Sequence, residues 1–404
     1  GLQTERQIFQ QLLGSEQRQA MVHAFFAERA AARVPELRGS PARPLRRIGV
    51  VGGGTMGSGI VAAALLAGFD VTLVETAGDS LQAATARVSA ILRGAVARGK
   101  LGEAEAERMM AQRLVPATGC AALADADLVI EAVVEDLSVK QSVFRALDAL
   151  CRPDCVLASN TSYLDIDALA SVTNRAGSVL GLHFFAPVHA MKLLEVVVPE
   201  EAAPEAVATG FALAKRMAKT AVWSGVCDGF IGNRILHRCR TVADQMVLRG
   251  VDPSEIDAAL VAFGYPMGPY AVADLAGLDI GWANRKRRAQ LYGAAASDAQ
   301  FPDQLCAMGH FGRKTGKGYY DYSADTGGKD AGRALAPNPD ATAMIAAERA
   351  ARGPAPLPAS APFDAAQVVR GFLAAMVNEA GKIVEEGIAR RPSDVDVVLI
   401  AGYG

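Results

Sequence analysis

The sequence of 404 residues is poor in the features that mark several classes of protein. Its 41 Lys and Arg are balanced by 43 Asp and Glu, and the net charge of -2 excludes the broad basic surface of a nucleic-acid-binding or lipid-binding protein. Its six cysteines include no Cys-x-x-Cys pair, which indicates reduced thiols in a cytosol-like compartment. We expect a cytoplasmic location of the bacterial type, with a peroxisomal or a mitochondrial location as the alternatives. No apolar run reaches the roughly 18 residues that span a bilayer, so no membrane span is expected. No grouping of His, Cys, Asp and Glu has zinc-site spacing, so no metal is expected.

What is present is an ordinary globular composition, with 51% hydrophobic and 21% charged residues, in a chain long enough for two or three domains. Apolar side chains recur at three- and four-residue spacing over 4–36, which predicts one helix. The Pro- and Arg-rich residues 41–47 then mark a boundary. Because the sequence begins in a helix-like stretch and stops in a turn-like Ala-Gly-Tyr-Gly, we expect a fragment of a longer polypeptide.

From residue 47 to about residue 224, short apolar runs alternate with amphipathic stretches. This alternation predicts a parallel sheet covered by helices, which is a doubly wound α/β fold of the Rossmann type. The expected strands are Ile48–Val51, Val71–Glu75, Leu128–Val134, Cys155–Ser159 and Val179–His183. The expected helices are Met56–Leu66, Ser80–Arg98 and Ser138–Leu150.

Beyond residue 224 the strand pattern ends, and an all-helical region is expected. Its helices are Phe230–Leu248, Pro253–Phe263, Ala271–Ala289 and a last one over 365–387. Residues 326–362 include an Ala- and Pro-rich tract and are predicted to be a flexible linker. The segment 250–257 is echoed by 387–396. The chain therefore contains either two similar helical units that pair as a pseudo-dimer, or two helix starts that are alike by chance.

The strongest motif is a glycine-rich loop between the first strand and first helix of the sheet region. Gly52-Gly-Gly54-Thr55-Met56-Gly57 fits the pattern G-x-G-x-x-G in the strand–loop–helix setting that gives it meaning. In such a loop the first glycine makes the tight turn, the second lets a pyrophosphate approach the backbone, and the third lets helix and strand pack closely. The helix start offers free N–H groups and its positive dipole end to the phosphates. The motif predicts a dinucleotide site.

Glu75 ends the next expected strand of the sheet. A carboxylate at this place accepts a hydrogen bond from a ribose 2′-hydroxyl and repels a 2′-phosphate. The cofactor expected from these residues is therefore NAD and not NADP.

Polar residues stand after two further apolar strands, at Ser162 and His183. Ligands of open α/β sheets bind beyond the carboxyl ends of the strands, so both residues are candidates to meet a substrate. His183 suits hydride chemistry at an alcohol, because the hydroxyl proton must leave with the hydride and an imidazole accepts protons near neutral pH. Glu195 is a candidate to hold the ring and to stabilise the imidazolium. Taken alone, His183 fits a hydrogen-bonded core histidine equally well.

Eight short motifs follow one another along the chain. They are GGGTMG at 52–57, EAVVE at 131–135, SNTS at 159–162, GLHFFAP at 181–187, MKLLEVV at 191–197, DGFIGNR at 228–234, GYPMGP at 264–269 and GRKTGKG at 312–318. In this order they resemble the signatures of the L-3-hydroxyacyl-CoA dehydrogenase family over about residues 46–322. Residues 1–37 resemble the helix that follows the enoyl-CoA hydratase domain of multifunctional fatty-acid oxidation enzymes, and 365–404 resemble their second C-terminal repeat.

The resemblance implies NAD-dependent oxidation of an L-3-hydroxyacyl-CoA to a 3-ketoacyl-CoA in fatty-acid β-oxidation. It implies that His183 is the general base and Glu195 its electrostatic partner. It also implies that Ser162 hydrogen-bonds the substrate hydroxyl near the nicotinamide, and that Asn233 orients the reacting oxygen and the histidine. The further cofactor contacts that it implies are Glu135, Lys140 and Lys314. On sequence alone, both lysines fit a solvated surface as well.

The resemblance also implies how the chain divides. The expected parts are a linker helix over 1–40 left from a hydratase domain, an NAD-binding domain over 45–224, a helical dehydrogenase domain over 225–325, the linker 326–362, and a truncated second helical repeat over 363–404. The helical domains are expected to pair, either in a homodimer or within one chain. A thiolase subunit is an expected partner of the parent bifunctional protein.

The sequence departs from the family pattern in two places, one at Ala186 and one in the helix after Glu75. Ala186 stands where many members carry Asn, so an amide contact near the nicotinamide is missing. Ile91 and Arg98 stand where short members carry CoA-contacting Ser and Lys. Arg98 is therefore either a substrate contact for a CoA phosphate or part of a solvated basic face.

Two other functions fit the sequence. One is a related NAD-dependent dehydrogenase that uses free 3-hydroxyacids, and the other is a non-catalytic nucleotide-binding scaffold of a fatty-acid oxidation complex. Ser162, His183, Glu195 and Asn233 occur together, which favours an enzyme over a scaffold.

Overall fold

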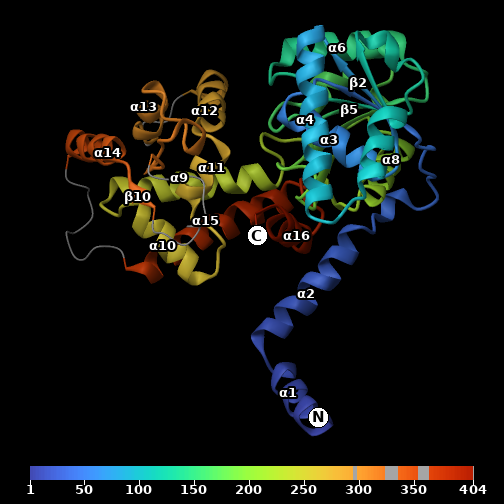
Figure 1. Cartoon of the computed structure of the whole chain (residues 1–404). Helices are drawn as coiled ribbons and strands as arrows, with labels where there is room; N and C mark the ends of the chain where they lie inside the picture. Colours follow the sequence, from blue (N-terminus) through green and yellow to red (C-terminus); the bar gives the residue numbers. More distant parts are fainter. Residues whose placement is uncertain (294–297, 324–334, 354–363, 404) are drawn as a thin grey trace. The chain divides into compact units, whose positions relative to one another are not determined.

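In the computed structural model, residues 1–293, 298–323, 335–353 and 364–403 are described (Figure 1). The contacts divide the chain into two units. The first unit holds Gly1–Arg234 together with Ala380–Gly404, and the second holds Ile235–Glu379. No described helix is long and apolar enough to cross a membrane.

The first unit is built on an eight-stranded sheet in the order β3-β2-β1-β4-β5-β6-β7-β8. All its pairings are parallel except that of β6 with β7, which is antiparallel. The strands are β1 Arg47–Val51, β2 Asp70–Glu75, β3 Leu114–Thr118, β4 Leu128–Glu131, β5 Val156–Ser159, β6 Val179–Phe184, β7 Leu193–Val197 and β8 Thr220–Ser224. The chain winds outward in both directions from β1 and β4, which confirms the Rossmann-type prediction.

Helices cover both faces of this sheet, because the strands are apolar on both sides. One face packs against α3 (Thr55–Leu66), α4 (Gly78–Ala97) and α8 (Pro204–Arg216), and these helices lie together in Figure 1. The other face packs against α6 (Leu137–Leu150) and α7 (Ile166–Ala170). The first unit also contains the short helix α5 (Glu103–Arg108).

Some sequence predictions for this unit are wrong in detail. Residues 4–36 form two helices, α1 (Leu2–Leu13) and α2 (Glu16–Ala31), because Gly14 ends the first and Ser15 caps the second through its side chain. The fourth strand ends at Glu131 and not at residue 134. Strands β3, β7 and β8 were not among the predicted strands; β3 is a partly exposed edge strand that contains a proline, a pattern that hides a strand in sequence.

The second unit is mainly helical, as predicted, with a two-residue antiparallel ladder between β9 (Tyr320–Asp321) and β10 (Ala336–Pro337). Its helices are α9 (Gly232–Leu248, which starts in the first unit), α10 (Pro253–Phe263), α11 (Pro269–Ala276), α12 (Leu278–Tyr292), α13 (Phe301–Ala307), α14 (Pro339–Arg352) and α15 (Ala365–Glu385, which ends in the first unit). The single helix predicted over 271–289 is wrong: Gly277, at φ +102°, separates α11 from α12.

The flexible linker predicted over 326–362 is wrong in its middle, because α14 lies there and packs against α13. The rest of that prediction lies largely outside the described residues. The last helix, α16 (Pro392–Tyr403), packs against α2, β7 and β8 of the first unit. The segment predicted as a second helical repeat over 363–404 is therefore shared between the two units.

Candidate active site

The glycine-rich loop joins β1 to α3 at the carboxyl edge of the sheet. Gly52 has φ +93°, and a Cβ there would meet the Ala132 carbonyl oxygen at 2.7 Å. A Cβ on Gly57 would lie 1.8 Å from the Gly52 oxygen, so this turn and the first turn of α3 require glycine at both places. Gly54 differs, because a Cβ there would meet nothing within 4 Å. The backbone at Gly54 therefore faces open space, as a close approach of a pyrophosphate requires.

Gly54 is the N-cap of α3, and no side chain caps it. Thr55 and Met56 form the first helical positions. The first N–H groups of a helix have no partner within the helix and point along its axis with a partial positive charge. The loop and helix start therefore fit the phosphates of a dinucleotide.

Substitution of Gly54 by Ala tests this fit. Because the methyl group would enter open space, we expect the fold to be retained. The methyl group would obstruct a phosphate at the backbone, and the loss of one charge-assisted hydrogen bond weakens NAD binding about 10- to 100-fold. Isothermal titration with NAD checks the affinity and thermal unfolding checks the fold; unchanged affinity contradicts the predicted pyrophosphate position.

Glu75 ends β2 beside this loop. Its Oε1 accepts a hydrogen bond from the Gly53 backbone N–H at 2.6 Å. The carbonyl oxygen of the same residue, Gly53, accepts a hydrogen bond from Arg87 of α4 at 2.7 Å. The carboxylate predicted to contact the ribose is thus tied to the glycine loop itself.

A buried ion-pair network connects β4 with α6. The Lys140 Nζ donates to Glu131 Oε1 at 2.7 Å and lies 3.4 Å from Glu135 Oε2. Lys140 is 1% exposed and Glu131 is fully buried, so the solvated-surface alternative for Lys140 is wrong. Glu131 also accepts from Val133 N at 2.7 Å and from Ser159 Oγ at 2.6 Å. A buried charge needs this many partners to be tolerated.

The same network reaches Ser162. Glu135 Oε1 accepts from the Ser162 backbone N–H at 2.9 Å and from the Thr161 hydroxyl at 2.5 Å. The predicted residues Glu135, Lys140 and Ser162 therefore lie together at the ends of β4 and β5. Sequence reasoning did not single out Glu131, Ser159 or Thr161, although the EAVVE and SNTS motifs contain them.

His183 and Glu195 face each other across the antiparallel pair of β6 and β7, where they are directly opposite in register. The His183 Nδ1 lies 2.6 Å from Glu195 Oε2, and both side chains are buried. The other oxygen, Glu195 Oε1, accepts from the backbone N–H groups of Ile231 and Gly232 at 3.1 and 3.0 Å. These amides stand at the N-terminal end of α9, so the dipole of that helix favours the charged carboxylate.

The surroundings of this pair are aromatic. The rings of Phe185 and Phe230 lie 4.4 and 5.5 Å from the His183 ring, measured between centroids. Because an ionised carboxylate only accepts hydrogen bonds, it selects the tautomer of His183 that carries its proton on Nδ1. The second nitrogen, Nε2, then keeps a free electron pair.

Asn233 lies one residue into α9, and its Oδ1 accepts from the Tyr403 hydroxyl at 2.9 Å. Tyr403 belongs to α16 and carries no sequence signal that we recognised. Asn160 was also missed; its Oδ1 accepts from the Phe184 backbone N–H at 3.0 Å and so ties β5 to the end of β6. Ala186 follows this strand end and is exposed.

The remaining two predicted residues lie elsewhere. Arg98 is the exposed C-cap of α4. The pKa of His189, in the loop after β6, is lowered first by burial of the His189 ring and then by the positive charge of Arg98. Lys219 adds to that effect, and burial lowers the pKa of Lys219 itself to about 8. Lys314 belongs to the second unit, in which its Nζ donates to Asp279 Oδ1 at 2.5 Å.

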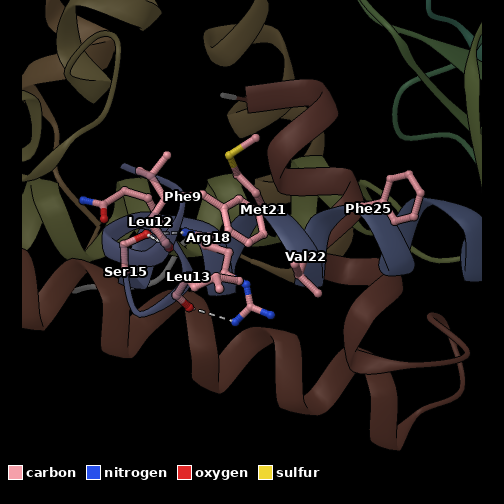
Figure 2. Close-up of a pocket in the computed structure, with 9 residues that line it drawn as sticks. Phe9, Leu12, Leu13, Ser15, Arg18, Met21, Val22 and Phe25 are labelled. Atoms are coloured by element: carbon pink, nitrogen blue, oxygen red, sulfur yellow. Dashed lines mark hydrogen bonds between the residues drawn. The ribbon is translucent and has the colours of Figure 1, made fainter. Parts of the chain in front are cut away.

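An apolar groove lies between α1 and α2, apart from these residues (Figure 2). Its lining side chains include Phe9, Leu12, Met21, Val22 and Phe25. The groove carries no titratable pair and supplies no chemistry. No set of three or more His, Cys, Asp and Glu side chains in the described part of the chain is arranged to hold a metal ion.

A Rossmann-type sheet with a glycine-rich loop, a terminal Glu75 and a His–Glu pair at its carboxyl edge defines a dinucleotide-dependent dehydrogenase. Two family models match the chain: the NAD-binding domain of 3-hydroxyacyl-CoA dehydrogenase over residues 47–227, and the C-terminal domain of the same enzyme over residues 229–322. The chain belongs to the 3-hydroxyacyl-CoA dehydrogenase family and is an NAD-dependent enzyme. The predicted family and cofactor are thereby confirmed.

Known proteins resemble the chain over more than two thirds of its length. The peroxisomal bifunctional enzyme of Homo sapiens is 38% identical over 428 residues, which cover 100% of this chain and 56% of that protein. The (S)-3-hydroxybutyryl-CoA dehydrogenase from Ralstonia eutropha is 33% identical, with a TM-score of 0.64, over 69% of this chain and 100% of that one. The dehydrogenase part of multifunctional enzyme 1 from C. elegans is 26% identical, with a TM-score of 0.64, over 95% and 86%. The chain spans little more than half the length of the curated relatives that it matches.

Proposed function

We propose that this chain interconverts L-3-hydroxyacyl-CoA and 3-ketoacyl-CoA, with NAD as the hydride carrier. The observation that supports this most is the buried contact of 2.6 Å between His183 Nδ1 and Glu195 Oε2 at the carboxyl edge of the sheet that carries the glycine loop. Nicotinamide, when bound, accepts the hydride that leaves C3 of the substrate. The chain's own task is then to hold the alcohol and to remove its proton.

His183 takes this proton at Nε2, the nitrogen that Glu195 leaves free. As the imidazole becomes an imidazolium, the carboxylate of Glu195 stabilises the new charge and keeps the ring in place. The backbone N–H groups of Ile231 and Gly232 hold Glu195 in place at its other oxygen. In the reverse direction the same nitrogen returns the proton to the ketone oxygen.

Ser162 and Asn233 are proposed to hold the reacting oxygen by hydrogen bonds, and each makes a hydrogen bond to a residue far from it in sequence. Ser162 is supported by its backbone bond to Glu135. Under this proposal, the missing amide at Ala186 alters affinity but leaves the His183–Glu195 pair intact.

For the cofactor, we assign the pyrophosphate to the loop from Gly52 to Gly57 and the adenosine ribose to Glu75. The bond from the Gly53 N–H to Glu75 supports this, because it holds a carboxylate where a 2′-phosphate would otherwise lie. Glu135, Lys140 and Lys314 remain proposed cofactor contacts. Lys140 acts under this proposal through Glu131, with which it is buried, and through the more exposed Glu135.

For the CoA part of the substrate, Arg98 is the proposed phosphate contact. Arg98 is exposed at the end of α4, where its guanidinium is accessible. An exposed guanidinium can bind a phosphate even in a chain of net charge -2.

Steady-state kinetics separate this proposal from its alternatives. We expect the chain to reduce acetoacetyl-CoA with NADH as the hydride donor. The rate with NADH should be much higher than the rate with NADPH. The same assay with free acetoacetate tests the alternative of a dehydrogenase for free 3-hydroxyacids. Such an enzyme would reduce free acetoacetate as fast as acetoacetyl-CoA. Binding of NAD without turnover of either substrate would support the non-catalytic scaffold and contradict the enzyme.

The wider setting is also a proposal. The relatives are named peroxisomal or glyoxysomal multifunctional enzymes of fatty-acid β-oxidation, which supports a parent with an additional hydratase domain. The absence of paired cysteines supports a reducing compartment, which we propose to be the cytoplasm. Pairing of helical domains and association with a thiolase remain proposals for the parent protein.

A further inference from the structure

The last helix of the chain contributes a side chain to the surroundings of His183. Tyr403 stands at the end of α16, and its ring packs edge-on against Phe185 at 5.7 Å between centroids. Phe185 in turn packs against the His183 ring at 4.4 Å. Gly232 leaves the space for the phenol, because a Cβ there would lie 2.8 Å from the Tyr403 hydroxyl oxygen.

Residues 386–403, which end in α16, are held to the rest of the first unit by three contacts. Arg234 makes a two-pronged ion pair with Glu386, with N–O distances of 2.5 and 2.8 Å, and this pairing lowers the pKa of Glu386. The Gly225 N–H donates to the Ile388 carbonyl oxygen at 2.7 Å. Gly402 packs so closely that a Cβ there would lie 2.6 Å from Leu193 of β7. These three contacts, all within the first unit, fix the position of Tyr403.

The hydroxyl of Tyr403 donates to Asn233 Oδ1 at 2.9 Å. Burial and the negative charge of Glu195 raise the pKa of Tyr403 well above its usual value, so the phenol stays protonated and remains a donor. An amide that receives a hydrogen bond on its oxygen has its NH₂ group left for another partner. An oxygen that gains negative charge during hydride transfer needs such a donor.

We propose that Tyr403 is a positioning residue of the active site, which holds the Asn233 side chain so that its NH₂ group faces the reacting oxygen. The inference rests on the proposed function, in which Asn233 meets that oxygen. It gives the end of the segment predicted as a second helical repeat a part in the reaction. Without the Tyr403 hydroxyl, the side-chain amide of Asn233 loses the hydrogen bond that fixes its orientation. Its NH₂ group then faces the reacting oxygen for only part of the time.

The test is a double-mutant cycle on acetoacetyl-CoA reduction by NADH, with the chain as it exists. Tyr403→Phe removes one oxygen and keeps the ring packing, so the melting temperature and NAD affinity should stay as in the unaltered chain. We expect kcat to fall about three- to tenfold, the effect of one lost hydrogen bond, with little change in KM. In an Asn233→Ala background, the same substitution should have no further effect on kcat, because its only route of action is already lost.

Tyr292→Phe is the matched control, because Tyr292 is 65% exposed and in the second unit, and it should leave kcat unchanged. An equal loss from Tyr403→Phe in both backgrounds, or no loss in either, overturns the positioning role. A fall in melting temperature with kcat unchanged also overturns it, because the hydroxyl is then purely structural. Absence of turnover by the unaltered chain is a different result. It contradicts the proposed dehydrogenase activity itself, on which the role of Tyr403 rests.

Discussion

Replacement of His183 by Ala is expected to lower kcat for acetoacetyl-CoA reduction by about 10²–10⁴-fold, the range for loss of a general acid or base. The protein should remain folded, because the substitution leaves the fixed partners of Glu195, the two amides of α9, in place. NAD affinity should change little, since the glycine loop lies at other strands of the sheet. The rate is measured by NADH absorbance under saturating substrate, and NAD binding by titration.

His23→Gln is a suitable control for this variant. His23 is also paired with a carboxylate, at 2.7 Å from Asp396, but its side chain is 57% exposed and lies on α2. We expect its loss to leave kcat unchanged. If His183→Ala turns over as fast as the unaltered chain, His183 is a core histidine, as the sequence alone allowed, and another group removes the proton.

Replacement of Lys140 by Met is expected to reduce the free energy of unfolding by about 3–5 kcal/mol, the cost of leaving a buried charge without its partner. Glu131 is fully buried and would keep only two uncharged donors, Val133 N and Ser159 Oγ. Urea unfolding followed by fluorescence measures the change. In a Trp282→Phe background, the only tryptophan left is Trp223, which lies in β8 and reports on the sheet unit.

A second substitution in the same network separates charge from packing. Glu131→Gln combined with Lys140→Met removes both charges and keeps an acceptor oxygen, so it should recover much of the lost stability. Arg46→Ala is the surface control, because the Arg46–Asp70 pair is 81% and 43% exposed on its two sides and should contribute less than about 1 kcal/mol. A loss for Lys140→Met as small as that of Arg46→Ala would show that water reaches Glu131.

The predictions that the structure confirmed depend on neighbours in sequence. The turn at Gly52 and the tight packing at Gly57 are properties of a few consecutive residues, so a glycine pattern between a strand and a helix was sufficient to find them. The break of the first helix at Gly14 and of a later one at Gly277 was missed, because an isolated glycine within a helical pattern is tolerated and does not by itself mark a helix end.

Residues that act across long separations were harder to predict. On sequence alone, Lys140 fits a solvated helix surface and a functional site equally well. Its burial beside Glu131, which only the structure shows, excludes the solvated surface. Tyr403 meets Asn233 across 170 positions, and no periodicity in either helix predicts that contact. Glu195 was identified, but β7 was not, and it is the antiparallel register of β7 that puts Glu195 opposite His183.

The glycine loop, the acid at the end of β2 and the order of motifs that marks the family could be read from the amino-acid sequence, because each is encoded by adjacent residues. Which charges are buried together, and which side chains surround His183, followed only from the folded chain. The hydrogen bonds to Glu195, the ion pair of Lys140 and the contact of Tyr403 all join segments that come together only when the sheet forms and α16 packs against it.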